Sequence, residues 1–221
     1  MEQLIKTFGV FVGALPAMAF AQTEVKQPNV VIIVADDLGY GDLSCYGATA
    51  IKTPGMDRVA NEGIRFTQGY CTAATSTPSR YSLLTGMYPW TNKGAKILPG
   101  NAALIIDQQQ VTLPKVMKKA GYVTGSVGKW HLGWSWGYTG NGRSMKDIDF
   151  SLPIKNGPTD RGFNYYFGIP ASLDISPYVY VENDEVTSIP DHVIEPQKKN
   201  LALLMHGGLA GADFKPEECF P

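Results

Sequence analysis

The feature that most constrains the fold is a continuous run of β-branched and aliphatic residues early in the chain. Residues 29–35 read Asn-Val-Val-Ile-Ile-Val-Ala, with no polar residue after the first position. Such a run is typical of a strand that is buried on both faces, as strands are in parallel sheets covered by helices. We therefore expect an α/β fold in which residues 29–35 form a buried strand.

Two carboxylates, Asp36 and Asp37, directly follow this run. In open α/β sheets, ligands bind beyond the carboxyl ends of the strands. Adjacent carboxylates at that place repel each other unless a cation lies between them, and oxygen ligands suit Ca²⁺ or Mg²⁺ rather than zinc. The pair therefore predicts a site for a hard cation, with a solvated Asp-Asp turn as the alternative.

A second pattern, Ser-Thr-Pro-Ser-Arg-Tyr-Ser-Leu-Leu-Thr-Gly, occupies residues 76–86. Pro78 suits the first turn of a helix, so Ser76 is expected at the helix start. Arg80 follows one turn later on the same face, and both side chains can reach one anion near the positive end of the helix dipole. The pattern predicts a nucleophile beside an anion-binding group, with an ordinary helix start and a surface arginine as the alternative.

Further α/β units are expected along the chain. A threonine cap, a proline in the first turn and a glycine at the end predict helices over residues 53–63 and 112–121. Strands are expected at 64–67 and 122–127, after each of these helices. Residues 179–186, around Asn-Asp, predict a hairpin.

The strand expected at 122–127 leads into Gly-Lys-Trp-His-Leu-Gly at residues 128–133. Lys129 and His131 are two residues apart, so on an extended segment their side chains point the same way and can face one pocket. A structural lysine and histidine are the alternative. The glycine-rich segment that follows carries Trp134 and Trp136, which could stack on sugar rings or pack in the interior.

Composition excludes several function classes. The chain is 44% hydrophobic and 18% charged, with a formal net charge of −1, so neither nucleic acid nor an acidic membrane is an expected partner. Cys45, Cys71 and Cys219 show no metal-ligand spacing and do not predict a disulfide scaffold. We expect Cys71 to be a small packed residue.

The first 21 residues have the pattern of a secretory signal peptide. Lys6 precedes an apolar run that ends in Ala19-Phe20-Ala21, a small-x-small cleavage site, and the run is too short to span a bilayer. A buried N-terminal helix is the alternative. We expect cleavage after Ala21, a periplasmic or secreted protein, and no membrane span.

Together these motifs resemble those of the formylglycine-dependent sulfatases of the arylsulfatase type. Their signature is Cys or Ser, any residue, Pro, any residue and Arg, followed by Leu-Thr-Gly, and residues 76–86 fill it in its serine form. The resemblance runs from about residue 29 to the end of the chain. It implies an alkaline-phosphatase-like α/β fold, a mixed and mostly parallel sheet flanked by helices, in which residues 22–221 form the N-terminal part of the catalytic domain.

The resemblance also implies a mechanism. Ser76 would be oxidised to formylglycine by a maturase of the anaerobic radical type, and the hydrated aldehyde would attack the sulfur of a sulfate monoester and then release sulfate. An unmodified serine would be trapped as a sulfate ester. Arg80 and Lys129 would neutralise negative charge, and His131 would assist deprotonation.

Ligands and substrate follow from the same resemblance. Asp36, Asp37 and Ser76 would bind Ca²⁺, and Lys129 and His131 would contact the substrate. Ser172, in the segment Gly-Ile-Pro-Ala-Ser-Leu-Asp, would help to hold the sulfate group. An exported sulfatase with an aromatic segment beside its Lys-His motif suggests glycan degradation, with a sulfated sugar as substrate and an aryl sulfate as the alternative.

Two other classes of function stay open. One is a metal-dependent phosphatase or phosphodiesterase of the same superfamily, in which unmodified Ser76 acts with zinc. The other is an inactive truncated fragment, because the family's second active-site histidine, its second lysine and its later calcium ligands are expected beyond Pro221. On that basis, we expect residues 1–221 alone to be catalytically silent and poorly soluble.

Overall fold

The computed structural model describes residues 27–196 and 205–216. The chain divides into two compact units, residues 1–40 and 41–221, each described by itself. The predicted signal peptide and Cys219 lie outside the described residues. Within the described ranges, no helix has the length and apolar composition needed to cross a bilayer.

In the first unit, the expected strand at residues 29–35 is wrong. These residues are irregular, and the side chains of Val31 and Ile33 are 81% and 83% exposed. A strand exists only when a neighbour completes its hydrogen-bond ladder, and no described strand pairs with this segment. β-Branched side chains favour strands, but this preference does not by itself supply a partner strand.

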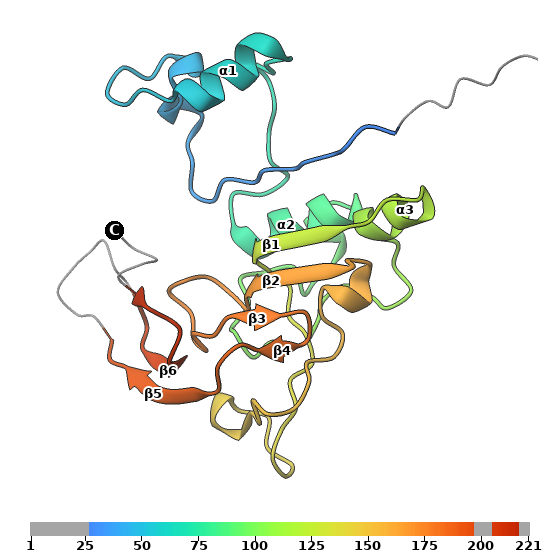
Figure 1. Cartoon of the computed structure of the whole chain (residues 1–221), viewed down its shortest axis with the longest axis vertical. Coiled ribbons are helices and arrows are strands. Elements are labelled where there is room, and N and C mark those ends of the chain that lie inside the picture. Colours follow the sequence, from blue (N-terminus) through green and yellow to red (C-terminus); the bar gives the residue numbers. More distant parts are fainter. Residues whose placement is uncertain (1–26, 197–204, 217–221) are drawn as a thin grey trace, which may run out of the picture. The chain divides into compact units, whose positions relative to one another are not determined.

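The second unit contains a four-stranded mixed sheet in the order β1-β2-β3-β4 (Figure 1). The first two strands pair in parallel, from Gly125 opposite Tyr165 to Lys129 opposite Ile169. The other two pairs are antiparallel. The mixed sheet and its helices confirm the expected fold class. The strands are β1 (Gly125–Lys129), β2 (Tyr165–Ile169), β3 (Val181–Glu182) and β4 (Glu185–Val186).

A hairpin joins β3 and β4, as expected, and Asn183 turns the chain with a φ of 57°. Asparagine tolerates this left-handed conformation better than most residues do. A second, two-stranded antiparallel sheet contains β5 (Pro190–Ile194) and β6 (Gly208–Gly211). Its core is a small cluster of buried residues: Tyr178, Met205, Ala210 and Phe214.

The three expected helices are confirmed as α1 (Pro54–Glu62), α2 (Ser76–Thr85) and α3 (Leu113–Lys119). Short 3₁₀ helices connect the larger elements. Around α1, the Ser44 hydroxyl donates to the Asp57 carboxylate at 2.7 Å, which ties the preceding 3₁₀ turn to the helix. The 3₁₀ helices are η1 (Tyr40–Asp42), η2 (Ser44–Tyr46), η3 (Pro89–Thr91), η4 (Met145–Asp147) and η5 (Thr159–Arg161).

Two strand predictions are corrected. Residues 64–67 are irregular, and β1 begins at Gly125 instead of residue 122. After α3, Gly121 adopts a φ of 89°, and the Tyr122 N–H donates to the Met117 carbonyl. This is the Schellman motif, with which helices commonly end at glycine. Because the motif includes the first residues of the predicted strand, the strand starts later than expected.

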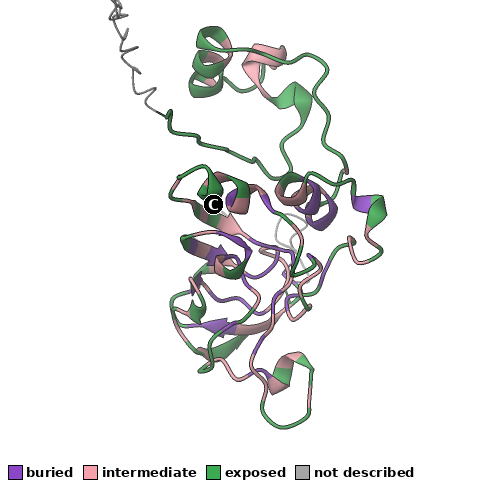
Figure 2. Cartoon of the chain, turned by 90° about the vertical axis from the view of Figure 1, so that its right-hand side faces the viewer, coloured by how far each residue is buried: buried purple, intermediate pink, exposed green. Residues whose placement is uncertain are grey.

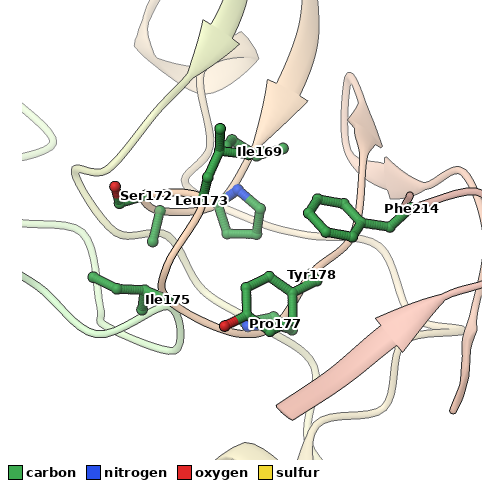
Figure 3. Close-up of a pocket in the computed structure, with 9 residues that line it drawn as sticks. Ile169, Ser172, Leu173, Ile175, Pro177, Tyr178 and Phe214 are labelled. Atoms are coloured by element: carbon green, nitrogen blue, oxygen red, sulfur yellow. The ribbon is translucent and has the colours of Figure 1, made fainter. Parts of the chain in front are cut away.

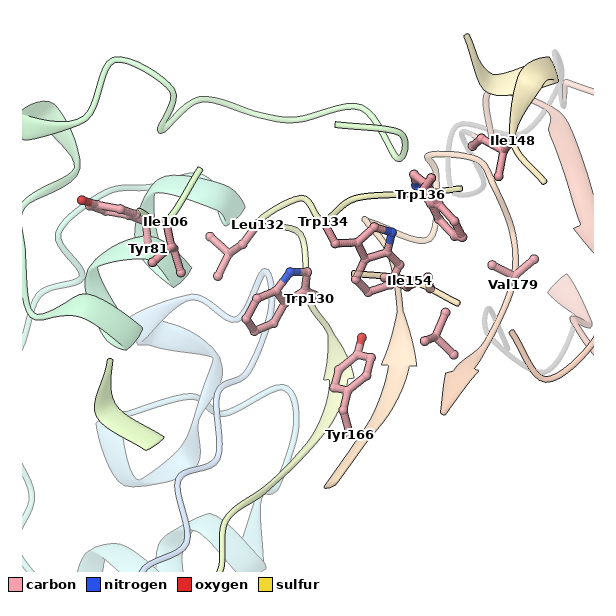
Figure 4. Packing of buried hydrophobic residues seen from close by; sticks show 11 residues of the cluster. Tyr81, Ile106, Trp130, Leu132, Trp134, Trp136, Ile148, Ile154, Tyr166 and Val179 are labelled. Carbon is pink, nitrogen blue, oxygen red and sulfur yellow. The ribbon is translucent and has the colours of Figure 1, made fainter. Parts of the chain in front are cut away.

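The main core lies against the four-stranded sheet (Figures 2 and 4). Trp134 and Trp136 are only 2% and 5% exposed, and their rings pack edge to face at 5.2 Å. The idea that these tryptophans stack on a sugar is therefore wrong. Trp130 and Leu132 are also buried, so alternate residues from Trp130 to Trp136 pack in the core.

Candidate active site

The start of helix α2 carries the predicted nucleophile. Ser76 is the first helical residue, Thr75 before it is extended, and Gly86 ends the helix with a φ of 68°. Arg80 lies one turn further on the same face, and its Nε–H donates to Ser76 Oγ at 3.1 Å. Serine and arginine therefore meet as their spacing predicts.

Arg80 also fixes the end of strand β1. Its Nη1 donates to the carbonyl oxygen of Lys129 at 2.6 Å. One guanidinium group thus contacts both the Ser76 hydroxyl and the main chain of the Gly-Lys-Trp-His-Leu-Gly segment. The fixed fork of nitrogens on arginine suits such a double contact.

The imidazole of His131 lies on the other side of the same hydroxyl. Its Nδ1 is 3.0 Å from Ser76 Oγ, and its Nε2 is 2.9 Å from the carbonyl oxygen of Leu98. The backbone of His131 has a φ of 54°, which is uncommon for a non-glycine residue. Two hydrogen bonds hold it there, from Thr77 Oγ1 to the His131 carbonyl and from the His131 N–H to the Pro170 carbonyl.

Burial lowers the pKa of His131 below its ordinary value, because removal from water disfavours the charged ring. The positive charges of Lys129 and Arg80 lower this pKa further, and they outweigh the opposing effect of Asp174. The hydrogen bond with the Leu98 carbonyl also opposes the shift. The neutral imidazole, which can accept a proton, is therefore the favoured form near pH 7.

Lys129 and Ser172 complete the group of charged and polar side chains. Lys129 is the last residue of β1, and its Nζ is 3.4 Å from Ser172 Oγ, just beyond the end of β2. These are the carboxyl ends of two parallel strands, where α/β sheets place their ligands. In Figure 3, the Ser172 hydroxyl points away from Phe214 and Tyr178.

The hollow in Figure 3 is not a substrate pocket. Its lining is mainly apolar, and it has no room for a water molecule. A larger open groove lies beside Tyr81, Met87 and Gln110. Neither hollow is lined by Ser76, so the candidate site does not coincide with either of them.

The structure thus brings together five of the seven predicted site residues: Ser76, Arg80, Lys129, His131 and Ser172. The other two, Asp36 and Asp37, belong to the first unit, where Asp37 has a φ of 55°. Among the described residues, no group of three or more His, Cys, Asp or Glu side chains is placed to hold a metal ion.

Two residues that hold the site were not predicted from the sequence. Thr77 is fully buried, and its hydroxyl fixes the His131 backbone, although the signature accepts any residue there. Leu98 contributes a main-chain carbonyl, for which a sequence carries no signal. The expectation for Cys71 is also corrected, because this thiol is exposed; it and Cys45 are free cysteines.

Known proteins resemble this chain over most of its length. The family profile described as Sulfatase matches residues 28–194. An N-acetylgalactosamine-6-O-sulfatase of Bacteroides thetaiotaomicron is 51% identical over 164 residues, which are 74% of this chain and 30% of that protein. Human arylsulfatase H is 38% identical over 160 residues, which are 68% of this chain and 26% of that protein.

A solved structure shares the fold. It is a B. thetaiotaomicron 6S-sulfatase described in connection with the metabolism of multiple glycosaminoglycans, and it matches with a TM-score of 0.68 and 47% identity. The match covers 79% of this chain and 35% of that one, so the chain spans only about a third of the length of these relatives. Because the family profile covers most of its length and this solved structure shares its fold, the chain belongs to the sulfatase family.

Proposed function

We propose that the protein carrying this chain hydrolyses sulfate monoesters and that residue 76 supplies the nucleophile. One observation carries the proposal: Ser76 Oγ lies within hydrogen-bond distance of both Arg80 Nε, at 3.1 Å, and His131 Nδ1, at 3.0 Å. A nucleophile needs a group that removes its proton and a charge that stabilises the negative oxygens of the reacting ester. Membership of the sulfatase family supports sulfate as the group transferred.

Each side chain of the cluster has a role in this proposal. Arg80 is permanently charged, and with Lys129 it concentrates positive charge near the sulfate oxygens. Neutral His131 accepts the proton of the residue-76 hydroxyl. The Ser172 hydroxyl, 3.4 Å from Lys129 Nζ, adds a donor for a sulfate oxygen.

Oxidation of Ser76 to formylglycine is part of the proposal, with a maturase of the anaerobic radical type as the partner. Hydrated formylglycine supplies two hydroxyl groups on one carbon, so one can attack sulfur and the other can help sulfate to leave. The position suits a reactive group, because Ser76 is half-buried at a helix start and the Arg80 Nε–H is already directed at its oxygen.

Calcium fits the chemistry of the proposed ligands. Asp36, Asp37 and residue 76 offer only oxygen atoms, which a hard cation prefers, but Ca²⁺ takes six to eight ligands and needs further oxygens. In this proposal the three residues hold the ion, and its charge offsets that of the sulfate group.

We propose a sulfated carbohydrate as the substrate. Support comes from relatives, since one is named an N-acetylgalactosamine-6-O-sulfatase and another is linked to glycosaminoglycan metabolism. The tryptophans after His131 give no support, because they are buried. An exported location, with the signal peptide removed after Ala21, would place the enzyme where sulfated glycans occur.

The test is sulfate release by the intact protein that carries this sequence, made together with a radical maturase. We expect turnover of an aryl sulfate and of 6-sulfated N-acetylgalactosamine, and a strong loss of activity after calcium chelation. The Ser76→Ala protein should show no turnover. Thr75→Ala, which changes the neighbouring hydroxyl, is the matched control and should stay active. Zinc-dependent turnover of an aryl phosphate without sulfate release would contradict the proposal and favour the phosphatase alternative.

A further inference from the structure

The two nitrogens of His131 face oxygens of different kinds. Nε2 is 2.9 Å from the Leu98 carbonyl oxygen, which can only accept a hydrogen bond. Nδ1 is 3.0 Å from the Ser76 hydroxyl, which can donate or accept. In a neutral imidazole only one nitrogen carries the proton, and the hydrogen bond made by the other nitrogen decides which.

A bare nitrogen facing the Leu98 carbonyl would place two lone pairs against each other in the interior, since His131 is only 2% exposed. Unpaired buried polar atoms are costly. The arrangement with a proton on Nε2 satisfies both contacts, because Nδ1 then accepts from the Ser76 hydroxyl. The geometry therefore favours one tautomer.

The Leu98 carbonyl is held in place by the core. Residues 92–105 form a loop, here called the Leu98 loop, that runs beside residues 131–136. Three hydrogen bonds attach this loop to that segment. The Trp136 Nε1–H donates to the Gly100 carbonyl at 3.0 Å, and the Trp134 N–H donates to the Ala102 carbonyl at 3.1 Å. The Ile105 N–H donates to the Leu132 carbonyl at 3.1 Å.

We propose that the Leu98 carbonyl fixes His131 as the Nε2–H tautomer, with Nδ1 open towards residue 76, and that Trp136 is the positioning residue that holds this carbonyl. The proposal rests on the proposed function, in which His131 accepts the proton of the residue-76 hydroxyl. The O–H bond of residue 76 breaks, an N–H bond forms at Nδ1, and the resulting imidazolium keeps its bond to Leu98. With the opposite tautomer, Nδ1 could not accept this proton.

The direct test is the protonation state of each ring nitrogen. We would label the intact protein with ¹⁵N-histidine and record long-range ¹H–¹⁵N spectra at about pH 8, above the ordinary histidine pKa of about 6.5. The resonances of His131 are those missing from His131→Gln. We expect a protonated Nε2 and an unprotonated Nδ1; the reverse pattern would overturn the proposal.

A matched pair of variants tests the role of Trp136. Trp134 and Trp136 are both buried and touch each other, but among the described residues the Trp134 Nε1–H has no hydrogen-bond partner. Trp136→Phe therefore removes a hydrogen bond that Trp134→Phe does not. We expect Trp136→Phe to lower kcat about threefold to tenfold, as loss of one hydrogen bond does, with KM unchanged and a mixture of His131 tautomers.

Trp134→Phe should keep both kcat and the tautomer. Equal effects of the two variants, or a Trp136→Phe protein with wild-type kcat and tautomer, would contradict the role of Trp136. If Trp136→Phe does not fold, the wild-type spectrum still decides the tautomer. That spectrum needs no turnover, so an Nε2–H tautomer in a protein that releases no sulfate would refute the proposed function and leave the positioning claim standing.

Discussion

Arg80 contacts both the nucleophile and the main chain of strand β1 with a single guanidinium group. We predict that Arg80→Lys, which keeps the charge but has one nitrogen, lowers kcat/KM about tenfold to a hundredfold. That is somewhat less than the 10²–10³ lost when a donor to a developing negative oxygen is removed altogether. The measurement is steady-state hydrolysis of an aryl sulfate.

The control for Arg80→Lys is the same change at Arg58, an exposed residue of α1 that is paired with Glu62. Surface pairs of this kind contribute little, so Arg58→Lys should be indistinguishable from wild type. Equal activity of the Arg80→Lys protein and the wild type would remove Arg80 from the proposed catalytic group.

His131 should make stability depend on pH. Its folded-state pKa is lowered, first by burial and then by Lys129 and Arg80, so the unfolded chain binds a proton more readily than the folded chain does. The contribution of neutral His131 is therefore complete above about pH 6.5, the unfolded value, and is lost as pH falls through the folded pKa. We expect the free energy of unfolding to fall between about pH 7 and pH 5.

Urea unfolding without added calcium, compared between wild type and His131→Gln, measures this dependence. His131→Gln, whose side chain takes up no proton in this range, should flatten the slope seen in wild type. An unchanged slope in His131→Gln would show that the imidazole titrates alike in both states.

Much of the site could be predicted at the scale of residues, because the spacing of Ser76 and Arg80 on a helix fixes which face they share. Lys129 and His131 were also expected in one site, although His131 reaches it with a left-handed φ of 54° and not with the extended backbone that their spacing assumes. The contribution of Leu98 could not be predicted, since any residue supplies the same carbonyl. Whether Trp134 and Trp136 are buried depends on which face of their segment meets the core, and the sequence pattern alone does not determine that face.

At the scale of elements, the helices and the β3–β4 hairpin were predictable because their signals are local. Proline, threonine and glycine mark where α1, α2 and α3 begin and end. Strands depend on partners that are distant in sequence, so the runs at 29–35 and 64–67 gave wrong predictions. Local chemistry at Gly121 also moved the start of β1 by three residues.

At Gly133, the segment that follows β1 lies very close to the Leu98 loop. The φ of Gly133 is 74°, and a Cβ atom there would lie 2.1 Å from the backbone oxygen of Ala103. Because neither side is a flexible side chain, we predict that Gly133→Ala destabilises the protein by about 1–3 kcal/mol and displaces the Leu98 loop. Urea unfolding gives the free energy.

Gly140→Ala separates strain from crowding. Gly140 has a similar φ of 62°, but a Cβ atom there would meet no atom within 4 Å. This control should cost about 1–2 kcal/mol from backbone strain and leave activity intact. If the two variants lose the same stability and activity, the contact between Gly133 and Ala103 does not hold the loop.

For the molecule as a whole, the chain spans about a third of the length of its relatives, and its first residues predict export. We predict that the secreted or periplasmic protein begins at Gln22, as determined by N-terminal sequencing. Ala21→Leu should impair cleavage, because the site requires a small residue, whereas Gln22→Ser should not. A cytosolic protein that retains Met1 would contradict the prediction.

The role of residue 76 as the nucleophile for sulfate esters can be tested on the unmodified serine. Ser76 Oγ would attack sulfur, expel the alcohol and retain the sulfate group, because an ordinary serine has no second hydroxyl on the same carbon to release it. Protein made without the maturase would be incubated with an aryl sulfate and digested with trypsin. Residues 66–80 would then be recovered as one peptide between Arg65 and Arg80.

Mass spectrometry of that peptide is the measurement. We expect one added sulfate group on residue 76, formed more slowly in Arg80→Lys and absent in Ser76→Ala. Ser79→Ala, which removes the neighbouring hydroxyl of the same peptide, should still be labelled. Two results would contradict this role of residue 76. One is sulfate on a different residue. The other is an unlabelled peptide together with hydrolysis of the same ester by the Ser76→Ala protein made with the maturase.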